Sequence, residues 1–453
     1  MDLIITIAAF LFLIGVVITV HEGGHYLMAQ LGNIKILEFS IGFGKKIFSK
    51  RMGKDQTLFT LRLLPLGGYV KPLDKAALTD EEWLVLSEED KKRTLTNASR
   101  AKKALMVAGG PGFNFILAFI IYLFASSVVG ISPTPAKIAQ IMPTSLFAQA
   151  GMTEGETIKQ INGKDIKSMN DAFGNLANGA IKGQNIVIIT DKNTYNIDFS
   201  NLDLKKMDDN INRLIGVYFV SSEGDITTKK VNSGSPAEKD GLLIDDIVKK
   251  INGVEVRDLG KFIRILANNP GKMVELEVLR QDKVVLLKIL PEAKEQGSLV
   301  IGKIGASFKT INTKELPVQK LSIKESIAYS YDKVVDSAHT TLVSLGKLVT
   351  GQLSVKTISG PLAIADYSGK SAKIGLYAYL SVMAAISIAV GVFNLLPIPM
   401  LDGGLLVQYA VESIRQKDLA DSILSRLQFV GVAILGSMFF IAMFNDILKY
   451  VVL

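Results

Sequence analysis

The sequence of 453 residues contains no cysteine and only three histidines. The absence of cysteine excludes disulfide bonds and thiolate metal ligands. The net charge of +8 comes from basic residues that are not interleaved with aromatic residues on a compact soluble segment, so we expect no nucleic-acid partner. No basic residue precedes the first hydrophobic run. This run therefore lacks the charged start that is typical of a cleaved signal peptide.

Long hydrophobic runs are abundant in the chain. Hydrophobic residues make up 48% of the sequence and its mean hydropathy is +0.31, which is high for a soluble protein. Four runs are long enough to cross a bilayer as a helix, which takes about 20 residues. They cover residues 3–28, 105–129, 376–396 and 429–448. The predicted fold is an α-helical polytopic membrane protein with about four transmembrane helices.

Basic residues are unevenly distributed around these runs. Fifteen lysines and arginines lie between Lys35 and Lys103, and three of them, Arg100, Lys102 and Lys103, come directly before the second run. The positive-inside rule then predicts that residues 30–104 lie in the cytoplasm. Both termini, and the long segment between the second and third runs, are expected on the other side of the membrane.

The end of the first run carries a metal-binding pattern. His21 and His25 share one face of a helix, so both imidazoles can bind one metal ion, while Glu22 can act on the water that the ion activates. Chance matches to this short pattern are common, but ionisable side chains within a membrane span are costly and usually functional. We predict a zinc hydrolase site inside the membrane. The third histidine, His339, is not expected to take part.

A catalytic zinc site needs three protein ligands and one position for water. The sequence offers no histidine shortly after His25, and Glu38 follows it too closely. The best candidate is Asp402, in the stretch 394–404, where two prolines and two glycines break the third run. Such breaks are tolerated at membrane depth where the freed backbone faces protein or a wet cavity. Asn394, at the start of the stretch, can donate a hydrogen bond to a substrate carbonyl or oxyanion, or it can join two helices.

A tandem repeat lies between the second and third runs. Residues 151–166 align without gaps on residues 241–256, and their Ile-Asn-Gly triplets are 90 positions apart. Each copy is expected to contain a helical turn, a strand, an Asn-Gly turn, a helix and further strands. The expected positions are Ser145 and Ser235 before the helical turns, Ile158 and Val248 in the strands, Asn162 and Asn252 in the tight turns, and residues 185–190 and 274–279 in later strands.

This repeat resembles bacterial PDZ domains, in which a sheet edge beside a helix accepts a peptide as an added strand. The segments that begin at Ile215 and Ile304 are then expected to form the loop at the end of the groove. Alternatively, the pair serves as a spacer or a steric lid without binding any peptide.

Several motifs occur together in one order along the chain. They are the HExxH pattern of the first run, residues 110–115 of the second, the repeat, Ser359-Gly360-Pro361, the stretch 394–404, and Phe444-Asn445-Asp446 in the last run. With these motifs, and over nearly its whole length, the chain resembles the site-2 protease family of intramembrane zinc metalloproteases. It is similar in particular to the bacterial RseP-type branch, the regulator-of-sigma-E proteases.

The resemblance implies roles for individual residues. It implies that His21, His25 and Asp402 bind Zn²⁺, that Glu22 is the general base, and that Asn394 lies near the substrate.

The resemblance also implies a membrane re-entrant β-hairpin at residues 59–70, in which Gly67, Gly68 and Tyr69 present an edge to the substrate. The pattern of alternation alone would not have predicted this hairpin. In chain order, the predicted segments are a first transmembrane helix (1–30), a cytoplasmic loop with the hairpin (31–104), a second transmembrane helix (105–130), two PDZ domains (131–220 and 221–310), a peripheral amphipathic helix with a linker (311–375), a third transmembrane helix (376–410), a cytoplasmic loop (411–428) and a fourth transmembrane helix (429–453).

The activity implied by the resemblance is hydrolysis of peptide bonds within the transmembrane segments of single-span proteins, after a first cut elsewhere. The implied substrates are an anti-sigma factor of an envelope-stress pathway and remnant signal peptides. The implied location is the lipid bilayer of the bacterial inner membrane, with the PDZ domains in the periplasm. A zinc transporter would need polar residues across the whole membrane, whereas these runs are polar at one depth. A PDZ scaffold with a dead metal site would lack part of the catalytic set, which is complete here.

Overall fold

The computed structural model describes residues 2–131, 134–206, 211–220, 223–296, 299–311 and 318–452. The chain forms two compact units. The helical unit consists of Met1–Gly130, Lys320–Leu345 and Ile358–Ile447. The repeat unit consists of Ile131–Gln319, Gly346–Thr357 and Leu448–Leu453.

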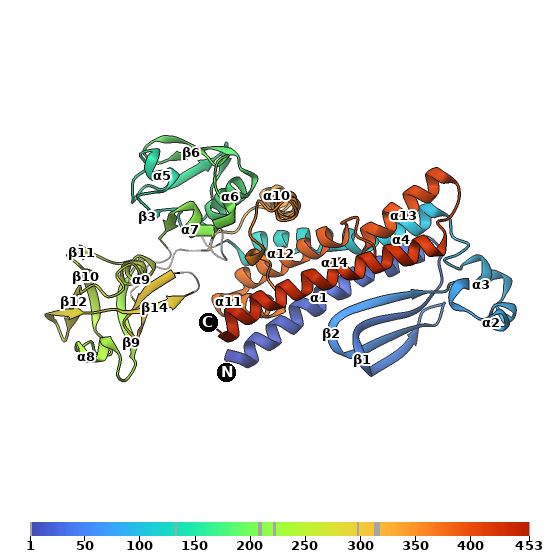
Figure 1. The fold of residues 1–453 in the computed structure, drawn as a ribbon, viewed down its shortest axis with the longest axis horizontal. Helices are drawn as coiled ribbons and strands as arrows, with labels where there is room; N and C mark the ends of the chain where they lie inside the picture. The colour runs from blue at the N-terminus through green and yellow to red at the C-terminus, as the bar shows by residue number, and fades with distance from the viewer. Residues whose placement is uncertain are drawn as a thin grey trace. The chain divides into compact units, whose positions relative to one another are not determined.

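Within the described residues, four helices of the helical unit are long and apolar enough to cross a membrane. They are α1 (Asp2–Leu31), α4 (Arg100–Phe124), α12 (Leu376–Asn394) and α14 (Asp421–Ile447) (Figure 1). A π-helical turn, η2 (Ala125–Val129), continues α4. The described structure therefore has a long apolar helix at each of the four hydrophobic runs, and α1, α4 and α14 extend beyond their runs.

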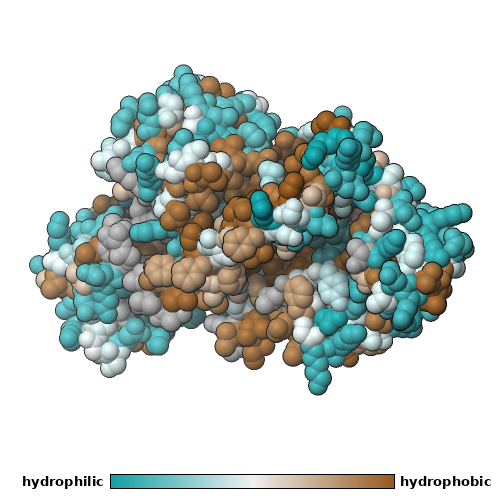
Figure 2. Space-filling model, turned by 45° about the vertical axis from the view of Figure 1, so that its right-hand side comes forward, coloured by the Kyte–Doolittle hydropathy of each residue, from teal (hydrophilic) through white to brown (hydrophobic). Residues whose placement is uncertain are grey.

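The core of the helical unit lies between α1, α4 and α12. Leu13 and Val17 of α1 are fully buried against Ala118 of α4 and against Ala384 and Ile388 of α12. The outer faces of the same helices expose many large apolar side chains, and hydrophobic residues gather over much of the face shown in Figure 2. This is the distribution expected of helices that meet lipid on one side and protein on the other.

Glycines allow α1 and α4 to approach closely beside the predicted metal ligands. A Cβ atom on Gly24 would lie 2.2 Å from the carbonyl oxygen of Gly109, and one on Gly109 would lie 2.5 Å from that of Gly24. Small residues at such a crossing let two membrane helices pack backbone against backbone. Any larger side chain at either position would separate the two helices.

The fourth span is joined to the rest of the helical unit by a buried carboxylate. Asp446 of α14 is 2% exposed and accepts hydrogen bonds from the backbone N–H groups of Gly360, Leu362 and Ala363, at the start of α11 (Pro361–Ile374). Asn445 donates a further bond to the carbonyl oxygen of Ile358. An acceptor from another helix thus satisfies the first turn of α11, whose own cap, a glycine, has no side chain. The motifs around Gly360 and Asp446, far apart in the sequence, meet here.

Other helices complete the helical unit, and two of them correct the predicted boundaries. The third predicted span at 376–410 is two helices, because α12 ends at Asn394 and α13 starts at Asp402. The loop predicted at 411–428 was too long, since α13 runs to Arg415 and α14 begins at Asp421.

The remaining helices are η1 (Lys75–Ala77), α2 (Asp80–Val85), α3 (Glu88–Lys92), the amphipathic α10 (Ile323–Val349), η4 (Val355–Thr357) and η5 (Leu448–Val452), of which η4, η5 and the end of α10 fall in the repeat unit.

A long antiparallel hairpin follows α1. It consists of β1 (Ile36–Met52) and β2 (Thr57–Pro72), with a turn at residues 53–56. The expected hairpin at 59–70 was therefore wrong in extent, because all of these residues belong to β2 and their partner strand, β1, was not predicted. β1 carries several lysines, and its apolar and polar residues do not alternate regularly. The sequence pattern therefore did not predict a strand there.

The hairpin bends back on itself and forms four paired segments. Residues 38–41 of β1 pair on one side with residues 58–61 and on the other with residues 68–71, while residues 46–52 pair with the far side of residues 57–62. The bend lies near Gly42, whose φ is +86° and whose Cβ atom, if present, would lie 2.7 Å from the carbonyl oxygen of Leu64. Residues 68–71 thus form an outer strand that pairs on one side only among the described strands.

The first copy in the repeat unit has the expected elements. Ser145 caps a helical turn, and Asn162 and Gly163 have φ values of +50° and +75°, as an Asn-Gly hairpin turn requires. One sheet has the strand order β5-β4-β6-β7 and a second pairs β3 with β8. The elements are β3 (Ile138–Ile141), α5 (Leu146–Gln149), β4 (Ile158–Ile161), β5 (Lys164–Asp165), α6 (Met169–Lys182), β6 (Asn185–Thr190), β7 (Thr194–Asp198), η3 (Leu204–Lys206), α7 (Ile211–Ile215) and β8 (Val217–Phe219).

The second copy repeats this arrangement. Ser235 caps its helical turn, and Asn252 and Gly253 repeat the same turn, with φ values of +50° and +76°. Its main sheet has the order β13-β12-β10-β9-β16, with β11 paired to β10, and a separate hairpin pairs β14 with β15. The elements are β9 (Asp225–Val231), α8 (Pro236–Lys239), β10 (Ile247–Ile251), β11 (Val254–Glu255), α9 (Leu259–Ala267), β12 (Val274–Arg280), β13 (Lys283–Ile289), β14 (Glu292–Gln296), β15 (Leu299–Lys303) and β16 (Ala306–Ile311).

Candidate metal centre

Two histidines of α1 point their outer ring nitrogens at one another. His21 and His25 are one helical turn apart, their Nε2 atoms are 3.3 Å apart, and their rings meet edge to face. His21 is 9% exposed and His25 is half-buried. Both rings are therefore held inside the helical unit with the same nitrogen facing the same point.

The break in the third span carries Asp402 to this point. α12 ends at Asn394, two prolines follow, and Met400 adopts a φ of +82° before α13 starts at Asp402. The turn is tight, because a Cβ atom on Gly403 would lie 2.2 Å from the carbonyl oxygen of Leu395. Prolines that end one helix and glycines that allow the return of the chain thus place a carboxylate at the start of the next helix.

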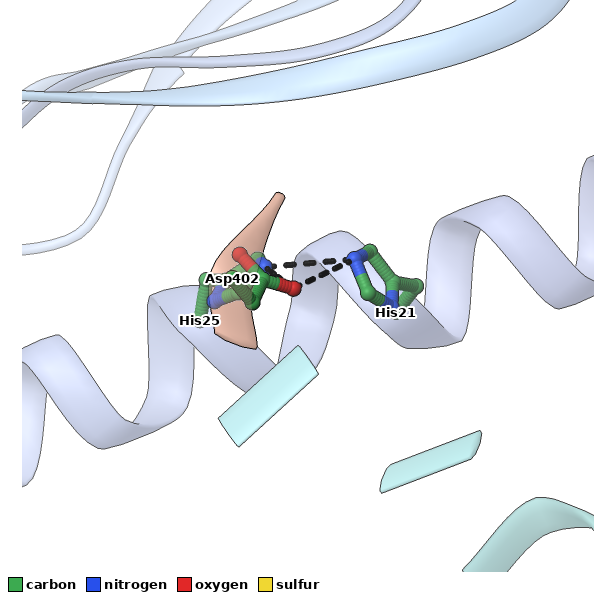
Figure 3. A group of neighbouring side chains, drawn as sticks. All are labelled: His21, His25 and Asp402. Atoms are coloured by element: carbon green, nitrogen blue, oxygen red, sulfur yellow. Dashed lines mark hydrogen bonds and ion pairs between the residues drawn. The ribbon is translucent and has the colours of Figure 1, made fainter. Parts of the chain in front are cut away.

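The three side chains form one cluster (Figure 3). Asp402 Oδ2 lies 3.3 Å from His21 Nε2 and 3.5 Å from His25 Nε2. This oxygen is buried and has no well-formed hydrogen bond among the described residues. Tetrahedral zinc with ligands at about 2.0–2.2 Å places its ligand atoms about 3.3–3.6 Å apart. The donor set of two imidazoles and one carboxylate, and their separations, fit a zinc ion with its fourth position open.

Contacts behind the rings come from α4. His25 Nδ1 lies 2.9 Å from the carbonyl oxygen of Met106, and His21 Nδ1 lies 3.2 Å from the side-chain amide of Asn114. Gly110 lies directly against both rings, since a Cβ atom there would come within 2.3 Å of His25 Nε2. Sequence reasoning assigned none of these three residues a role. The signal available was a glycine-rich stretch with one amide residue inside an otherwise apolar span.

The predicted base, Glu22, lies between the histidines and the outer strand of the hairpin. It is 9% exposed. A Cβ atom on Gly68 would lie 2.7 Å from Glu22 Cγ and 2.7 Å from the carbonyl oxygen of Ser40. Only glycine therefore fits at position 68, and the strand that contains it runs beside the predicted general base.

The other two predicted hairpin residues, Gly67 and Tyr69, contact neighbouring segments of the hairpin. A Cβ atom on Gly67 would collide with the ring of Phe43 at 2.2 Å. The hydroxyl of Tyr69 lies 2.8 Å from Arg62 Nη2, and Arg62 also binds Glu38 at 3.0 Å and Ser40 at 2.9 Å. One guanidinium thus joins three neighbouring segments of the bent hairpin, which fixes the outer strand relative to the others.

Two remaining polar residues were considered in the sequence, Asn394 and His339. Asn394 ends α12, and its amide donates to the carbonyl oxygen of Val390 in the same helix, at 3.1 Å. His339 lies exposed on α10 and does not belong to the metal-binding group. The structure thus brings together His21, His25 and Asp402, places Glu22 and Gly68 beside them, and leaves Asn394 bonded to its own helix.

Sequence comparisons cover almost the whole chain. Residues 9–438 match the sequence model of peptidase family M50. The regulator of sigma-E protease RseP of Salmonella typhimurium is 30% identical over 97% of this chain and 98% of its own. The protein of the same name from Escherichia coli K12 has the same identity and coverage. The protease RseP of Yersinia pestis is 29% identical over 98% of this chain and 99% of its own.

Proposed function

The chain belongs to peptidase family M50, and we propose that it is a zinc metalloendopeptidase of the site-2 type, which hydrolyses peptide bonds within the transmembrane segments of its substrates. The observation that carries this proposal is the cluster of His21, His25 and Asp402. Its two histidines lie on a helix that is long and apolar enough to span a membrane, and Asp402 begins the shorter helix that follows a second such helix. The donor atoms have the separations of a zinc site.

In this proposal, each polar residue of the site has one task. His21, His25 and Asp402 would hold a zinc ion, and such an ion would supply Lewis-acid chemistry by lowering the pKa of bound water to about 7 and polarising the scissile carbonyl. Glu22 accepts a proton from that water and passes it to the leaving amine. Asn394 turns its amide toward the substrate when substrate binds, which requires it to leave the carbonyl of Val390.

A transmembrane substrate must lose helical structure before it can be cut, because its peptide groups are hydrogen-bonded within the helix. The outer strand of the hairpin, residues 68–71, contains Gly68 next to Glu22 and is paired on one side only among the described strands. We infer that an unwound substrate segment adds to this edge as a further strand, which holds its backbone extended for attack. Helix-breaking residues in the substrate should promote cleavage, since proline costs a helix about 3 kcal/mol.

We infer that the two repeats are PDZ domains (131–220 and 221–310) and that they lie outside the cytoplasm. In the second repeat, β16 is an edge strand, and α9 lies beside it. A groove of about 730 Å³ is lined by Leu266 of α9, Phe308 of β16 and the loop containing Gly305, and the β14–β15 hairpin also lines it. An edge strand, a flanking helix and a closing loop are the parts that peptide binding by strand addition requires.

We favour a steric role for the repeats over peptide recruitment. The first repeat follows the second span directly, although α10 and α11 lie between the second repeat and the third span. Cleavage within a membrane also offers little readout of sequence. Substrates with bulky extracytoplasmic domains would then be excluded until a first cut removes them. Deleting about residues 135 to 308 should allow cleavage of an untrimmed substrate that the intact protein ignores. Slower cleavage of a trimmed substrate, reproduced by substitutions at Ile215 or Ile304, would instead support recruitment.

The proposed substrates are single-span membrane proteins, among them the anti-sigma factor of an envelope-stress pathway and remnant signal peptides. The proposed location is the inner membrane of a bacterium, with residues 30–104 in the cytoplasm and the repeats in the periplasm. In intact cells, a cysteine at Ser233 should react with an impermeant thiol reagent and one at Ser87 should not. The reverse labelling pattern would overturn this orientation.

The activity can be tested with purified protein and a synthetic transmembrane peptide in detergent or bilayers. Mass spectrometry should show products that end within the apolar segment. A zinc chelator should abolish them, and added zinc should restore them. Products that appear equally with and without the chelator would contradict a zinc mechanism.

A further inference from the structure

Asn114 is a fully buried amide within the second span. It lies on α4, it is 0% exposed, and its side-chain nitrogen is 3.2 Å from His21 Nδ1. Its backbone carbonyl oxygen accepts a bond from the hydroxyl of Ser387 on α12, at 2.9 Å. An amide at this depth is costly to bury unless its hydrogen-bonding groups are used.

The contacts of His25 show how a histidine ring of this cluster is oriented. His25 directs Nε2 toward Asp402 and leaves Nδ1 2.9 Å from the carbonyl oxygen of Met106, which can only accept. Nδ1 therefore carries the proton of His25, and the lone pair of Nε2 is free for a metal ion. A histidine that binds metal through one nitrogen almost always donates from the other, which fixes the orientation of the ring.

His21 faces the cluster through the same atom, so its Nδ1 must also donate when Nε2 binds a metal ion. An amide nitrogen opposite that N–H would place two donors face to face. The nitrogen and oxygen of an amide exchange places when the group turns by half a turn about its last bond. Asn114 Oδ1 has no hydrogen-bond partner among the described residues, so no bond of Oδ1 is lost on turning.

We propose that Asn114 is a positioning residue of the metal centre, in which its side-chain oxygen accepts a hydrogen bond from His21 Nδ1–H in the zinc-bound protein. This inference rests on the proposed zinc site. Asn114 touches neither substrate nor metal in this account. It acts by holding the His21 ring in the tautomer and orientation that leave Nε2 free. Loss of such a contact typically lowers metal affinity 10–100-fold.

The test measures zinc binding and not cleavage. Full-length protein carrying Glu22→Gln, which keeps the three metal ligands, is purified in detergent and titrated with zinc against a chromogenic chelator. Asn114→Leu, which has a similar shape and no acceptor, should weaken zinc binding 10–100-fold. Ser387→Ala removes a buried hydroxyl from the same region without touching His21, and its zinc affinity should equal that of the parent.

Asn114→Asp separates positioning from packing. Aspartate accepts from His21 Nδ1–H in either rotation, and in this background the zinc ion and Asp402 leave one positive charge uncompensated, which attracts a second carboxylate. We expect zinc affinity at least equal to the parent's, and a cobalt(II) absorption spectrum that stays tetrahedral. If Asn114 served only to fill space, leucine would leave zinc affinity unchanged, whereas loss of the acceptor should weaken it.

The outcomes distinguish this inference from the proposed function. A parent protein that binds no zinc would overturn the zinc site itself. A parent that binds zinc, beside an Asn114→Leu variant of equal affinity, would overturn the role of Asn114 alone. Weaker zinc binding in Asn114→Asp than in the parent would also overturn it, and this comparison remains decisive if the leucine variant does not fold.

Discussion

Among the residues that the structure describes, the helical unit contains a buried carboxylate oxygen without a well-formed hydrogen bond, whereas the buried carboxylates in the repeat unit are hydrogen-bonded. In the first repeat, Glu156 is 1% exposed and accepts bonds from Thr153, Thr190 and Tyr195. Ninety positions later in the second repeat, Asp246 is equally buried. It accepts from the backbone N–H of Leu243 and from two nitrogens of Arg280.

At equivalent positions, the two repeats thus satisfy a buried carboxylate with different hydrogen-bond donors. Thr190 and Arg280 occupy matching places in β6 and β12, and each donates to its own buried carboxylate. In the helical unit, Asp446 is likewise satisfied by three backbone N–H groups. Asp402 differs from these carboxylates. Its Oδ2 lies near two imidazole nitrogens and has no well-formed hydrogen bond in the described part of the chain.

This contrast separates the structural carboxylates from Asp402, the proposed metal ligand. A buried polar atom without a partner is costly, so it is kept where a ligand supplies the missing interaction. A carboxylate whose partners all come from its own fold should matter for stability. A buried carboxylate that lacks a hydrogen-bond partner in its own fold should matter for metal binding and activity. It should matter little for the stability of the metal-free protein.

The largest effect is expected at Asp402. Asp402→Ala should abolish both cleavage and zinc binding, because two histidines alone do not complete the site. Thermal unfolding followed in excess chelator should give nearly the same Tm for parent and variant, since Oδ2 has no well-formed bond to lose in the described structure. His25→Ala should likewise lose zinc and activity. A large drop in the Tm of metal-free Asp402→Ala would contradict the distinction drawn above.

The next effect concerns the strand beside the base. Gly68→Ala places a methyl group against Glu22 Cγ and the carbonyl oxygen of Ser40, and the carbonyl cannot move without shifting the hairpin. Displacing a catalytic group by about 1 Å can cost about 10²-fold in rate, so we expect a loss of that size with zinc content unchanged. Gly112→Ala is the control, because nothing lies within 4 Å of its added methyl. Equal cleavage rates in Gly68→Ala and Gly112→Ala would show that the hairpin does not contribute to the site.

A smaller effect, on stability alone, is expected in the second repeat. Asp246→Ala leaves the guanidinium of Arg280 without its partner, although Arg280 retains a bond to the carbonyl oxygen of Gly241 and some solvent contact. We expect a loss of about 1–3 kcal/mol in the stability of this repeat, measured by hydrogen exchange of residues 225–289. Cleavage of a trimmed substrate should stay within about two-fold, because only the repeat is affected.

The smallest effect is a pH dependence in the first repeat. Burial works to raise the pKa of Glu156, but hydrogen bonds from Thr153, Thr190 and Tyr195 outweigh it and hold the pKa at about 2. A pKa that is lower in the folded protein gives stability that is present above the unfolded value. That stability is lost as the pH falls from about 5 to about 2.

Hydrogen exchange of residues 134–206 in the full-length protein should therefore show loss of protection across this range, and Glu156→Gln should flatten the dependence. Glu154→Gln is the matched control, because Glu154 pairs with Lys261 at the surface and such pairs contribute little. A pH profile that is unchanged in Glu156→Gln would show that the carboxylate is not the cause.

Much of the metal centre could be predicted from the sequence because it depends on local spacing. Two histidines four residues apart share a helix face wherever a helix forms, and two prolines end a span regardless of its neighbours. The tandem repeat was readable for the same reason, since Asn162 and Asn252 mark turns that few other residues allow.

The parts that could not be predicted depend on contacts between distant segments. β1 has no clear alternation, because its residues 38–41 pair on both sides and residues 46–52 carry lysines, so its strand character follows from pairing with β2. The acceptor behind His25 is a backbone carbonyl, which has no signature in any side chain. The capping of α11 by Asp446 joins residues more than eighty positions apart. That Asn394 lies near the substrate stays a prediction, and in this structure its amide donates to the carbonyl oxygen of Val390 in its own helix.

The central claim is that Glu22 acts on zinc-bound water without holding the metal. Its most direct test measures zinc content and peptide cleavage together in purified Glu22→Gln. The account predicts that the variant keeps about one zinc ion per chain, as the three ligands His21, His25 and Asp402 are intact, while producing no cleavage products from a transmembrane peptide that the parent cuts. Cleavage at the parent's rate, or loss of zinc from the variant, would contradict it.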